Sequence, residues 1–375
     1  MSARPFVAAA KRAGYIVTAI DAFADRQTVE LADATVLVGC SDNGFDADAL
    51  LAVANKLDAS QYLGFVYGSG FEAQPELLQK VADVIPLIGN APAVVQAVKA
   101  PLAFFAALQQ NNTQHPEMLE QLPAHNAAGV EAVYLKKLVG GSGGTHIEIV
   151  DDECAKSSST KSSNYYYQRY VAGRPVSLLF VAHGHRITVV GFNEQWVDAV
   201  ASMPFRYGGA VSNIVLAERI QQQLIGVAEK LTAVFGLFGL NSLDAIVQGE
   251  SAYVLEINPR LSATVDLYAM DSHDSEHANL LNWHVNACLK DADCKYEKIV
   301  VKVSKAHAIV YAPFDLQIAH DFYWPEWVVD NPCSTMQISA GEPVCTVIAT
   351  ADSPDEAKQL AHIRVKMLQL EITTN

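Results

Sequence analysis

The sequence predicts a mixed fold, with an α/β domain at the N-terminus followed by an α+β region built on antiparallel hairpins. Strand-like and helix-like segments alternate through residues 1–90, which is typical of a small, parallel, Rossmann-like sheet. Later in the chain, pairs of β-branched runs are separated by short glycine-containing turns, which is typical of hairpins. A chain of 375 residues has room for two or three domains.

The first domain begins with a helix instead of a strand. This helix is expected over residues 6–13, so the strand that normally precedes it in a Rossmann-like sheet is expected to be absent. Asp21 and Asp25 lie either in a ligand-binding loop at a strand end or in a solvated loop that caps a helix. The glycine-rich segment 67–72 either closes over a substrate or forms a turn. Further strands are expected at 15–20, 35–39, 62–67 and 84–88, and helices at 47–57 and 75–82.

The composition excludes several classes of protein. Hydrophobic residues make up 50% of the chain and charged residues 18%, as in an ordered globular protein. A net charge of −15 argues against nonspecific binding to nucleic acid or to an anionic membrane, so an anionic substrate would need a local basic pocket. No apolar run reaches the roughly 18 residues of a membrane span, and no signal-peptide pattern opens the chain. The 6 cysteines form no Cys-x-x-Cys pair, and we expect reduced thiols in a cytoplasmic protein.

A hairpin over residues 243–260 carries the strongest indication of chemistry. With its turn centred on Glu250, the side chains of Asp244 and Glu256 face each other across neighbouring strands. Facing carboxylates repel one another and destabilise the strand pair. A divalent cation between them would remove that penalty, and such oxygen ligands suit Mg²⁺ that also holds nucleotide phosphates. The alternative is an edge hairpin with a solvated acidic face.

The remaining residues of this hairpin complete the candidate site. The alternation of a strand places Asn258 with the two carboxylates as a further oxygen ligand. Pro259 ends the strand, so that Arg260 lies beside the site with a fixed positive charge for a phosphate or a carboxylate. The opposite face is expected to be apolar and to consist of Leu243, Ala245, Leu255 and Ile257.

A strand ending in Lys136 and Lys137 leads into a glycine-rich loop and then into a second strand. The loop is not a Walker loop, which needs Gly-Lys-Ser/Thr at the start of a helix. Glycines let backbone N–H groups converge on phosphate oxygens, and Lys137 supplies charge while Lys136 points to the opposite face. The alternative is a long flexible hairpin. The candidate phosphate contacts in the loop are Gly141, Ser142, Gly143 and Gly144.

Taken in series, these elements resemble the ATP-grasp ligases. Glu-Ile-Asn-Pro-Arg at 256–260, after an aspartate-bearing strand, resembles the metal-binding end of that family. The spacing from Lys137 to Gly141 is similar to that of the family's lysine, although Leu138 stands where the family usually has proline. The resemblance covers nearly the whole chain. It is greatest to ATP-grasp proteins related to biotin carboxylase that accompany tetrahydromethanopterin and methylofuran metabolism in methylotrophic bacteria.

The resemblance implies further contacts with ATP. Lys99, at the entrance to the small nucleotide-binding domain, would contact the phosphates. Residues 165–173 resemble the strand and hinge on which the family lays adenine, with backbone groups reading the adenine edge. An arginine stands at 169, where the family commonly has an acidic side chain. The contacts implied here are Gln168, Arg169, Val171 and, for the ribose, Ser177.

The fold that the resemblance implies has four parts: a Rossmann-like pre-ATP-grasp domain at 1–92, a small nucleotide-binding subdomain at 93–172, a large subdomain with the metal site at 173–295, and a C-terminal module at 296–375. ATP would be clasped between two α+β subdomains with Mg²⁺ or Mn²⁺. A carboxylate would attack the γ-phosphate to give an acyl phosphate, and an amine would then displace phosphate. Lys99, Lys137, Arg260 and the metal would carry the charge. Arg206 is a candidate for gripping a substrate carboxylate.

The predicted function is therefore an ADP-forming ligase for small-molecule carboxylate and amine substrates. Joining glutamate to tyramine for methylofuran and extending a pterin side chain are two such reactions. The alternatives are a noncatalytic nucleotide-binding protein and a biotin-carboxylase-like carboxylase. A hydride-transfer domain is excluded because residues 1–90 contain no Gly-x-Gly-x-x-Gly. We expect no nucleic-acid or membrane partner. The sequence leaves undecided whether the protein forms a homodimer.

Two histidines four residues apart, His273 and His277, follow the hairpin. Such a pair can share a helix face and bind zinc, but no glutamate lies between them in the His-Glu-x-x-His manner. We expect a substrate-binding or solvated helix instead.

Overall fold

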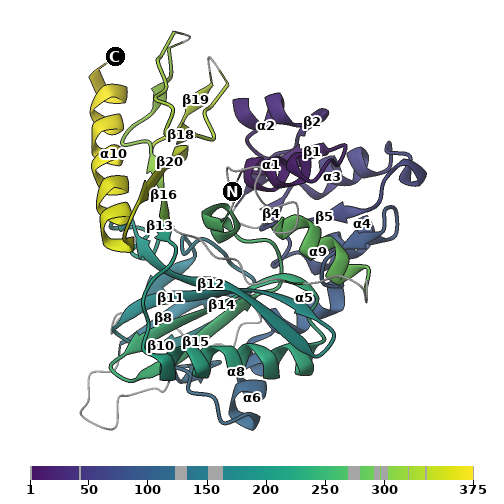
Figure 1. Ribbon diagram of the computed structural model, residues 1–375, viewed down its shortest axis with the longest axis vertical. Helices are drawn as coiled ribbons and strands as arrows, with labels where there is room; N and C mark the ends of the chain where they lie inside the picture. The colour runs from purple at the N-terminus through teal and green to yellow at the C-terminus, as the bar shows by residue number, and fades with distance from the viewer. Residues whose placement is uncertain are drawn as a thin grey trace.

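The computed structural model describes residues 2–41, 44–122, 133–150, 164–268, 279–290, 296, 303–319, 321–333 and 336–374. Figure 1 shows the purple N-terminal elements and the yellow C-terminal helix on either side above a central teal and green sheet. The predicted histidine pair, His273 and His277, lies outside the described residues.

The N-terminal region has the predicted alternation, built on parallel strand pairs. One pair is β1 (Thr18–Asp21) with β2 (Ala34–Leu37), and the other is β5 (Phe65–Val66) with β6 (Leu87–Ile88). The helices are α1 (Arg4–Arg12), α2 (Arg26–Leu31), α3 (Ala47–Ala54) and α4 (Pro75–Ala82), with a 3-10 turn η1 (Ala59–Gln61). The short helix α2 was not predicted. Asp25 caps it by accepting a hydrogen bond from the Thr28 N–H at 2.9 Å, so this loop has the capping role. A short antiparallel pair, β3 (Cys40–Ser41) with β4 (Gly44–Phe45), was also missed.

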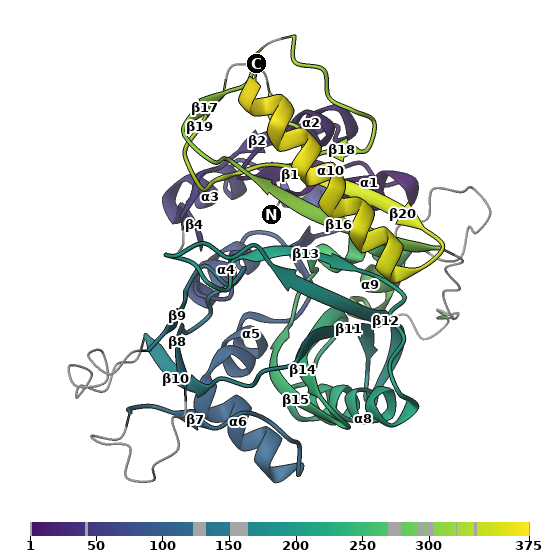
Figure 2. The same cartoon turned by 90° about the vertical axis from the view of Figure 1, so that its left-hand side faces the viewer.

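The next region combines two helices with a small antiparallel sheet. Helix α5 (Pro92–Lys99) stops where Pro101 begins α6 (Pro101–Gln110), because proline disfavours helical backbone in the residue before it. The sheet has the order β7-β10-β8-β9 and lies to one side of the larger sheet in Figure 2. Its strands are β7 (Met118–Leu119), β8 (Tyr134–Leu138), β9 (Ile147–Ile149) and β10 (Tyr165–Arg169).

An eight-stranded antiparallel sheet, ordered β15-β14-β11-β12-β13-β16-β20-β18, forms the centre of the molecule. Helix α8 (Glu218–Phe235) covers one face with an apolar stripe that includes Leu224, and it ends at Gly236 in the left-handed conformation. The other face is covered by a 3-10 turn, η2 (Ala263–Tyr268), and by α9 (Leu280–Cys288). The first five strands along the chain are β11 (Arg174–His183), β12 (Arg186–Val197), β13 (Tyr207–Val211), β14 (Gly239–Gln248) and β15 (Ser251–Asn258).

The C-terminal strands continue this sheet instead of forming a sheet of their own. Ala308 of β16 (Ser304–Tyr311) pairs with Gly209 of β13, and β20 (Pro343–Ala351) and β18 (Val328–Val329) follow. Helix α10 (Pro354–Thr374) packs on β16 and β20. A separate small pair joins β17 (Leu316–Gln317) to β19 (Gln337–Ile338). The segments on either side of residue 296 therefore share one sheet.

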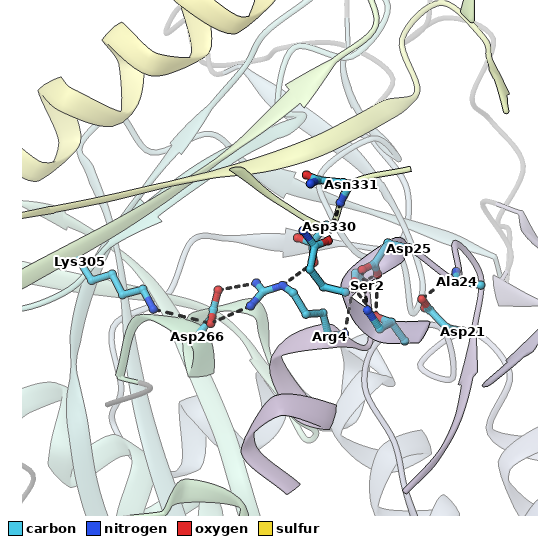
Figure 3. A network of polar contacts seen from close by, with 11 residues as sticks. Ser2, Arg4, Asp21, Ala24, Asp25, Asp266, Lys305, Asp330 and Asn331 are labelled. Carbon is cyan, nitrogen blue, oxygen red and sulfur yellow. Dashed lines mark hydrogen bonds and ion pairs between the residues drawn. The ribbon is translucent and has the colours of Figure 1, made fainter. Parts of the chain in front are cut away.

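A buried set of charges joins the N-terminal helix to the regions that follow it. Arg4 Nη2 lies 2.6 Å from Asp266 Oδ2 in η2, and Arg4 Nε lies 2.7 Å from Asp330 Oδ1, just after β18 (Figure 3). Lys305 Nζ of β16 lies 3.9 Å from the other oxygen of Asp266. Burial alone would raise the pKa of Asp266, but Arg4 and Lys305 outweigh it and hold this pKa well below its ordinary value. These ion pairs fix α1, η2 and the C-terminal strands relative to one another.

Neither a disulfide nor a single membrane-spanning helix is found in the described part of the chain. Cys40, Cys288, Cys333 and Cys345 are not cross-linked to one another. Helices α5 and α6 reach the length and apolar composition of a span only together, and they meet at 75°.

Candidate functional site

Strands β14 and β15 place Asp244 opposite Glu256, as predicted, but by a different route. The turn centres between Glu250 and the glycine before it, so an unbroken register would set Asp244 against Leu255. A β-bulge inserts one extra residue into β15 and brings Glu256 opposite Asp244. Val254 therefore fills the fully buried position on the apolar face. Leu255, predicted to share that face, is only partly buried.

Lys99, the last residue of α5, reaches the same face of the hairpin. Its Nζ lies 2.8 Å from Glu256 Oε2 and 3.0 Å from Asn258 Oδ1. Asn258 Nδ2 in turn donates to Asp244 Oδ2 at 2.9 Å. The three predicted metal ligands are thus together, and the ammonium group of Lys99 contacts two of the oxygens that a metal would use.

The two carboxylates have different electrostatic surroundings. Asp244 accepts hydrogen bonds from side-chain amides, including Gln195 Nε2 at 3.3 Å. Burial, together with the negative charge of Glu256, raises the pKa of Asp244. Burial acts on Glu256 in the same direction, but the positive charges of Lys99 and Lys137 outweigh it and lower the pKa of Glu256. An additional cation here would favour the ionised form of Asp244 and relieve its repulsion from Glu256.

Lys137 points toward the same charges from β8. It is 5% exposed, whereas Lys136 pairs with Glu148 at 3.2 Å on the opposite, exposed face, as predicted. Lys137 Nζ donates to Gln168 Oε1 on β10 at 3.2 Å. Gln168 is 2% exposed, and its Nε2 has no hydrogen-bond partner in the described structure. A buried donor left unpaired costs free energy, so this amide is suited to an acceptor on a ligand.

The glycine loop between β8 and β9 is packed tightly against its neighbours. A Cβ at Gly140 would lie 2.4 Å from the carbonyl oxygen of Glu72, and a Cβ at Gly144 would lie 1.9 Å from a carbonyl oxygen just before β13. Gly143 O accepts a hydrogen bond from the Tyr207 N–H at 2.9 Å. The glycines therefore allow close packing in addition to their predicted part in exposing N–H groups. The loop contains the predicted phosphate contacts Gly141, Ser142, Gly143 and Gly144.

His146, at the end of this loop, is a site residue that the sequence did not indicate. Its ring packs directly on the loop, because a Cβ at Gly141 would lie 2.4 Å from it. Its Nδ1 is buried and has no hydrogen-bond partner within the described ranges. Burial lowers the pKa of His146, Lys137 and Lys99 lower it further, and Glu256 opposes them. Three charged groups of the site, Lys99, Lys137 and Glu256, therefore act on this ring.

Arg260 lies beside the carboxylates but is already ion-paired. Its Nε donates to Glu72 Oε1 at 2.6 Å and its Nη1 to Leu261 O at 3.1 Å. The other oxygen of Glu72 accepts from the Gly70 N–H at 2.9 Å. Burial would raise the pKa of Glu72, but Arg260 and Lys99 outweigh it and lower this pKa. A substrate group would thus share Arg260 with a carboxylate of the N-terminal region.

Arg206, predicted to grip a substrate carboxylate, is engaged elsewhere. Its Nη2 lies 2.5 Å from Asp198 Oδ2, and its Nε donates to the backbone oxygen of Asp198 at 3.1 Å. Its Nη1 donates to Gly341 O at 3.4 Å, and the guanidinium lies 3.8 Å from the ring centroid of Tyr311. All three nitrogens bond within the protein, so a substrate carboxylate would have to compete with these partners, and the predicted role of Arg206 stays a prediction. Arg206 holds the β12–β13 connection to the C-terminal strands.

The predicted adenine and ribose contacts lie along β10 and β11. Arg169 is exposed, and its backbone N–H donates at 2.9 Å to the oxygen of Glu117, so that N–H is not available to adenine. Val171 follows the end of β10. Ser177 is fully buried in β11, where its Oγ accepts from Asn193 Nδ2 at 3.3 Å. Ser177 is also the register partner of Asp244, which places it next to the metal-ligand candidates.

Comparisons with known proteins agree with this architecture. Residues 100–264 match a family model described as an ATP-grasp domain. The crystal structure of an L-amino acid ligase from Bacillus licheniformis superposes with a TM-score of 0.71 at 15% identity, covering 96% of this chain and 94% of that one. The fold is ATP-grasp.

Two relatives of this chain come from Methanocaldococcus jannaschii. An uncharacterized protein is 22% identical over 370 residues, which is 93% of this chain and 86% of the relative. A tyramine–L-glutamate ligase is 27% identical over 115 residues, which is 30% of this chain and 35% of that ligase. The second match therefore spans about a third of the ligase.

The residues of the candidate site fit a magnesium–nucleotide complex. No group of three or more His, Cys, Asp or Glu side chains in the described residues could hold a metal alone. The two carboxylates and one amide need further oxygen atoms, and Mg²⁺ is usually held by one or two carboxylates together with substrate phosphates. The nearby lysines and the unpaired donor are what a phosphate-bearing ligand needs. These groups are Lys99, Lys137 and Gln168 Nε2.

The site residues that the sequence did not indicate contact the site from distant segments of the chain. Glu72 is 188 positions from Arg260 in the sequence, and Gln195 is 49 positions from Asp244. The available signal for Glu72 was its place in a glycine-rich segment after a strand, where open α/β sheets bind ligands.

Proposed function

We propose that the protein is an ATP- and Mg²⁺-dependent ligase that joins a carboxylate to an amine through an acyl phosphate. One arrangement carries the proposal: Asp244 and Glu256 face each other across a hairpin, with Lys99 bonded to one of them. The buried Lys137 on the facing sheet supports it, because a second cation there suits transferred phosphate. The likeness to an L-amino acid ligase supports the reaction class.

In the proposed mechanism the protein mainly positions reactants and neutralises charge. Asp244, Glu256 and Asn258 would hold Mg²⁺, which supplies charge neutralisation at the phosphates. Lys99 would exchange its contact with Glu256 for a phosphate oxygen, which leaves the carboxylate to the metal. Lys137 and the N–H groups of the glycine loop would hold the phosphates from the other side. Arg260, oriented by its bond to Glu72, would hold the substrate carboxylate for attack on the γ-phosphate.

The substrates we propose are glutamate as the carboxylate and an arylalkylamine or pterin precursor as the acceptor. The match to a tyramine–L-glutamate ligase supports glutamate and an amine of this kind. Such a reaction would belong to the biosynthesis of methylofuran-type or tetrahydromethanopterin-type carriers of one-carbon units.

A substrate screen tests the reaction class. The protein is incubated with Mg-ATP and pools of amino acids, amines, and pterin or furan precursors, and new amide masses are followed by mass spectrometry. ADP, AMP and phosphate are assayed in parallel. We expect ADP and a substrate-dependent amide. AMP release would contradict an acyl-phosphate route, and tight ATP binding without turnover on any pool would favour a noncatalytic nucleotide-binding protein.

The nucleotide site makes a separate prediction about two adjacent lysines. Lys137→Ala should weaken ATP binding by about 10–100-fold, because a charged hydrogen bond contributes about 1.5–3 kcal/mol. Lys136→Ala is the matched control, since it removes an exposed pair with Glu148 and a contact with the Tyr165 ring on the opposite face. Isothermal titration calorimetry measures both variants. Equal affinities in the two would remove Lys137 from the nucleotide site.

A further inference from the structure

A tyrosine–histidine pair on the central sheet has no part in the phosphate contacts above. Tyr207 Oη lies 2.7 Å from His307 Nε2, which joins β13 to β16. His307 is 3% exposed, whereas Tyr207 is only partly buried. The tyrosine is therefore the more exposed member of the pair.

Tyr207 is hydrogen-bonded to the glycine loop and is within electrostatic range of the carboxylate hairpin. Its backbone N–H donates to Gly143 O at 2.9 Å, and its carbonyl oxygen accepts from Tyr311 Oη at 2.7 Å. The charges of Asp244 and Arg260 both act on the Tyr207 hydroxyl. Burial, reinforced by Asp244, raises the pKa of Tyr207, so the hydroxyl keeps its proton at neutral pH. This position is within electrostatic range of Asp244, a proposed metal ligand, and of Arg260, the proposed substrate-carboxylate contact.

His307 is a neutral imidazole enclosed by charges from four elements. Burial lowers its pKa to about 4, and the carboxylate of Asp266 opposes this shift. With a neutral ring, Tyr207 can donate to Nε2, which leaves the tyrosine oxygen free to accept another proton. A nearby carboxylate also stabilises an imidazolium once it forms. The charged groups around the ring are Arg4 of α1, Asp266 of η2, Lys305 of β16 and Asp330 after β18.

We propose that Tyr207 and His307 receive the proton of the amine substrate in the second half of the reaction. The amine nitrogen forms a bond to the acyl carbon while the bond from that carbon to the phosphate oxygen breaks, and phosphate leaves with the electron pair. The proton on nitrogen passes to Tyr207 Oη as the tyrosine proton passes to His307 Nε2. Nitrogen becomes much more acidic as the C–N bond forms, so a weak base suffices. This assignment rests on the proposed ligase function and adds a proton acceptor to it.

Two nucleophiles separate proton transfer from the rest of the reaction. Hydroxylamine is a strong but weakly basic nucleophile that traps an acyl phosphate as a hydroxamate without help from a protein base, whereas an alkylamine depends on a base that takes its proton as the C–N bond forms. Tyr207→Phe removes the hydroxyl and keeps the ring, and His307→Gln keeps a polar group but cannot accept a proton. Both variants should lose about 100-fold in amide formation. Hydroxamate formation and carboxylate-dependent ADP release should change far less, and raising the pH should restore part of the amide rate.

The matched control is Tyr311→Phe, which removes a neighbouring hydroxyl that bonds only the backbone oxygen of Tyr207 among the described contacts. Its ratio of amide to hydroxamate should equal that of the wild type. Unchanged amide formation in Tyr207→Phe and His307→Gln would overturn the assignment, and so would an equal loss of both products. Wild-type protein that forms no hydroxamate with any carboxylate would overturn the ligase function itself, a result distinct from either of these.

Discussion

Two buried charge clusters in this protein contain the same residue type in opposite electrostatic states. In the cluster at the N-terminal helix, Asp266 lies 2.6 Å from Arg4, and Lys305 is nearby. In the hairpin cluster, Asp244 accepts hydrogen bonds from amides and faces the carboxylate of Glu256. The pKa of Asp266 is lowered and that of Asp244 is raised, although burial pushes both upward.

The difference distinguishes a structural cluster from a binding cluster. A buried carboxylate that is paired with a guanidinium is satisfied by the protein and helps to hold its segments together. A buried carboxylate that faces amides and another carboxylate has a negative charge that the protein does not fully compensate, and a bound cation would neutralise it. Burial alone does not explain the difference, because it pushes the pKa of both side chains upward. The surrounding charges decide which cluster can take a ligand.

The largest expected effect comes from breaking the structural cluster. Arg4→Met leaves Asp266 and Asp330 buried without their guanidinium, and we expect it to lower the free energy of unfolding by about 3–5 kcal/mol. Lys11→Met on the same helix removes a half-exposed pair with Asp33 and should cost less than about 1 kcal/mol. Urea denaturation measures both. Similar losses would show that the Arg4 cluster contributes no more than a surface pair.

The same cluster determines how the stability of the protein changes at acid pH. The pKa of Asp266 is lower in the folded protein than its ordinary value of 3.8, so its contribution to stability is complete above that value and is lost as the pH falls below it. Arg4→Met should therefore flatten the fall in stability below about pH 4. An unchanged acid limb in the variant would argue against Arg4 as the cause of this shift.

A substitution in the hairpin cluster should reduce turnover more than it reduces stability. Glu256→Gln removes a carboxylate from the proposed metal ligands, and turnover with Mg-ATP should fall at least about 100-fold. The fold should survive, because Asn258 Oδ1 still accepts from Lys99. Glu250→Gln at the turn is the matched control, since Glu250 makes an exposed pair with Arg219 and should leave turnover unchanged. Wild-type turnover in Glu256→Gln would remove this hairpin from the mechanism.

The features predicted correctly from sequence are those that short-range patterns determine. The bounds of α4 and the opposite faces of Lys136 and Lys137 follow from local periodicity and turn residues. The pairing of Asp244 with Glu256 was also predicted, but its cause was not. The bulge that sets this register depends on how β15 packs in the whole sheet.

Side-chain partners from distant segments could not be predicted. Both Arg206 and Arg260 were predicted to bind substrate, Arg206 from the family resemblance and Arg260 because Pro259 ends the strand beside the two carboxylates. The structure separates them by their partners: Arg206 bonds to Asp198 and Gly341, whereas Arg260 bonds to Glu72 beside the lysines of the site. Such contacts depend on tertiary packing, which one sequence does not specify.

The smallest expected effect is also the most direct test of the comparison. Asp244→Asn replaces a carboxylate whose ionisation is disfavoured in the folded protein, so without Mg²⁺ it should stabilise the protein by about 1 kcal/mol. Because the pKa of Asp244 is raised on folding, the gain should be present at pH 8 and should shrink as the pH falls and the wild-type carboxyl takes up its proton. Urea denaturation at pH 8 and pH 5.5 measures this difference.

The matched control is Asp266→Asn, which should destabilise the protein at both pH values because it breaks the pair with Arg4. If both substitutions were destabilising at pH 8, Asp244 would be a satisfied structural carboxylate like Asp266, and the proposed metal site would lose its electrostatic basis.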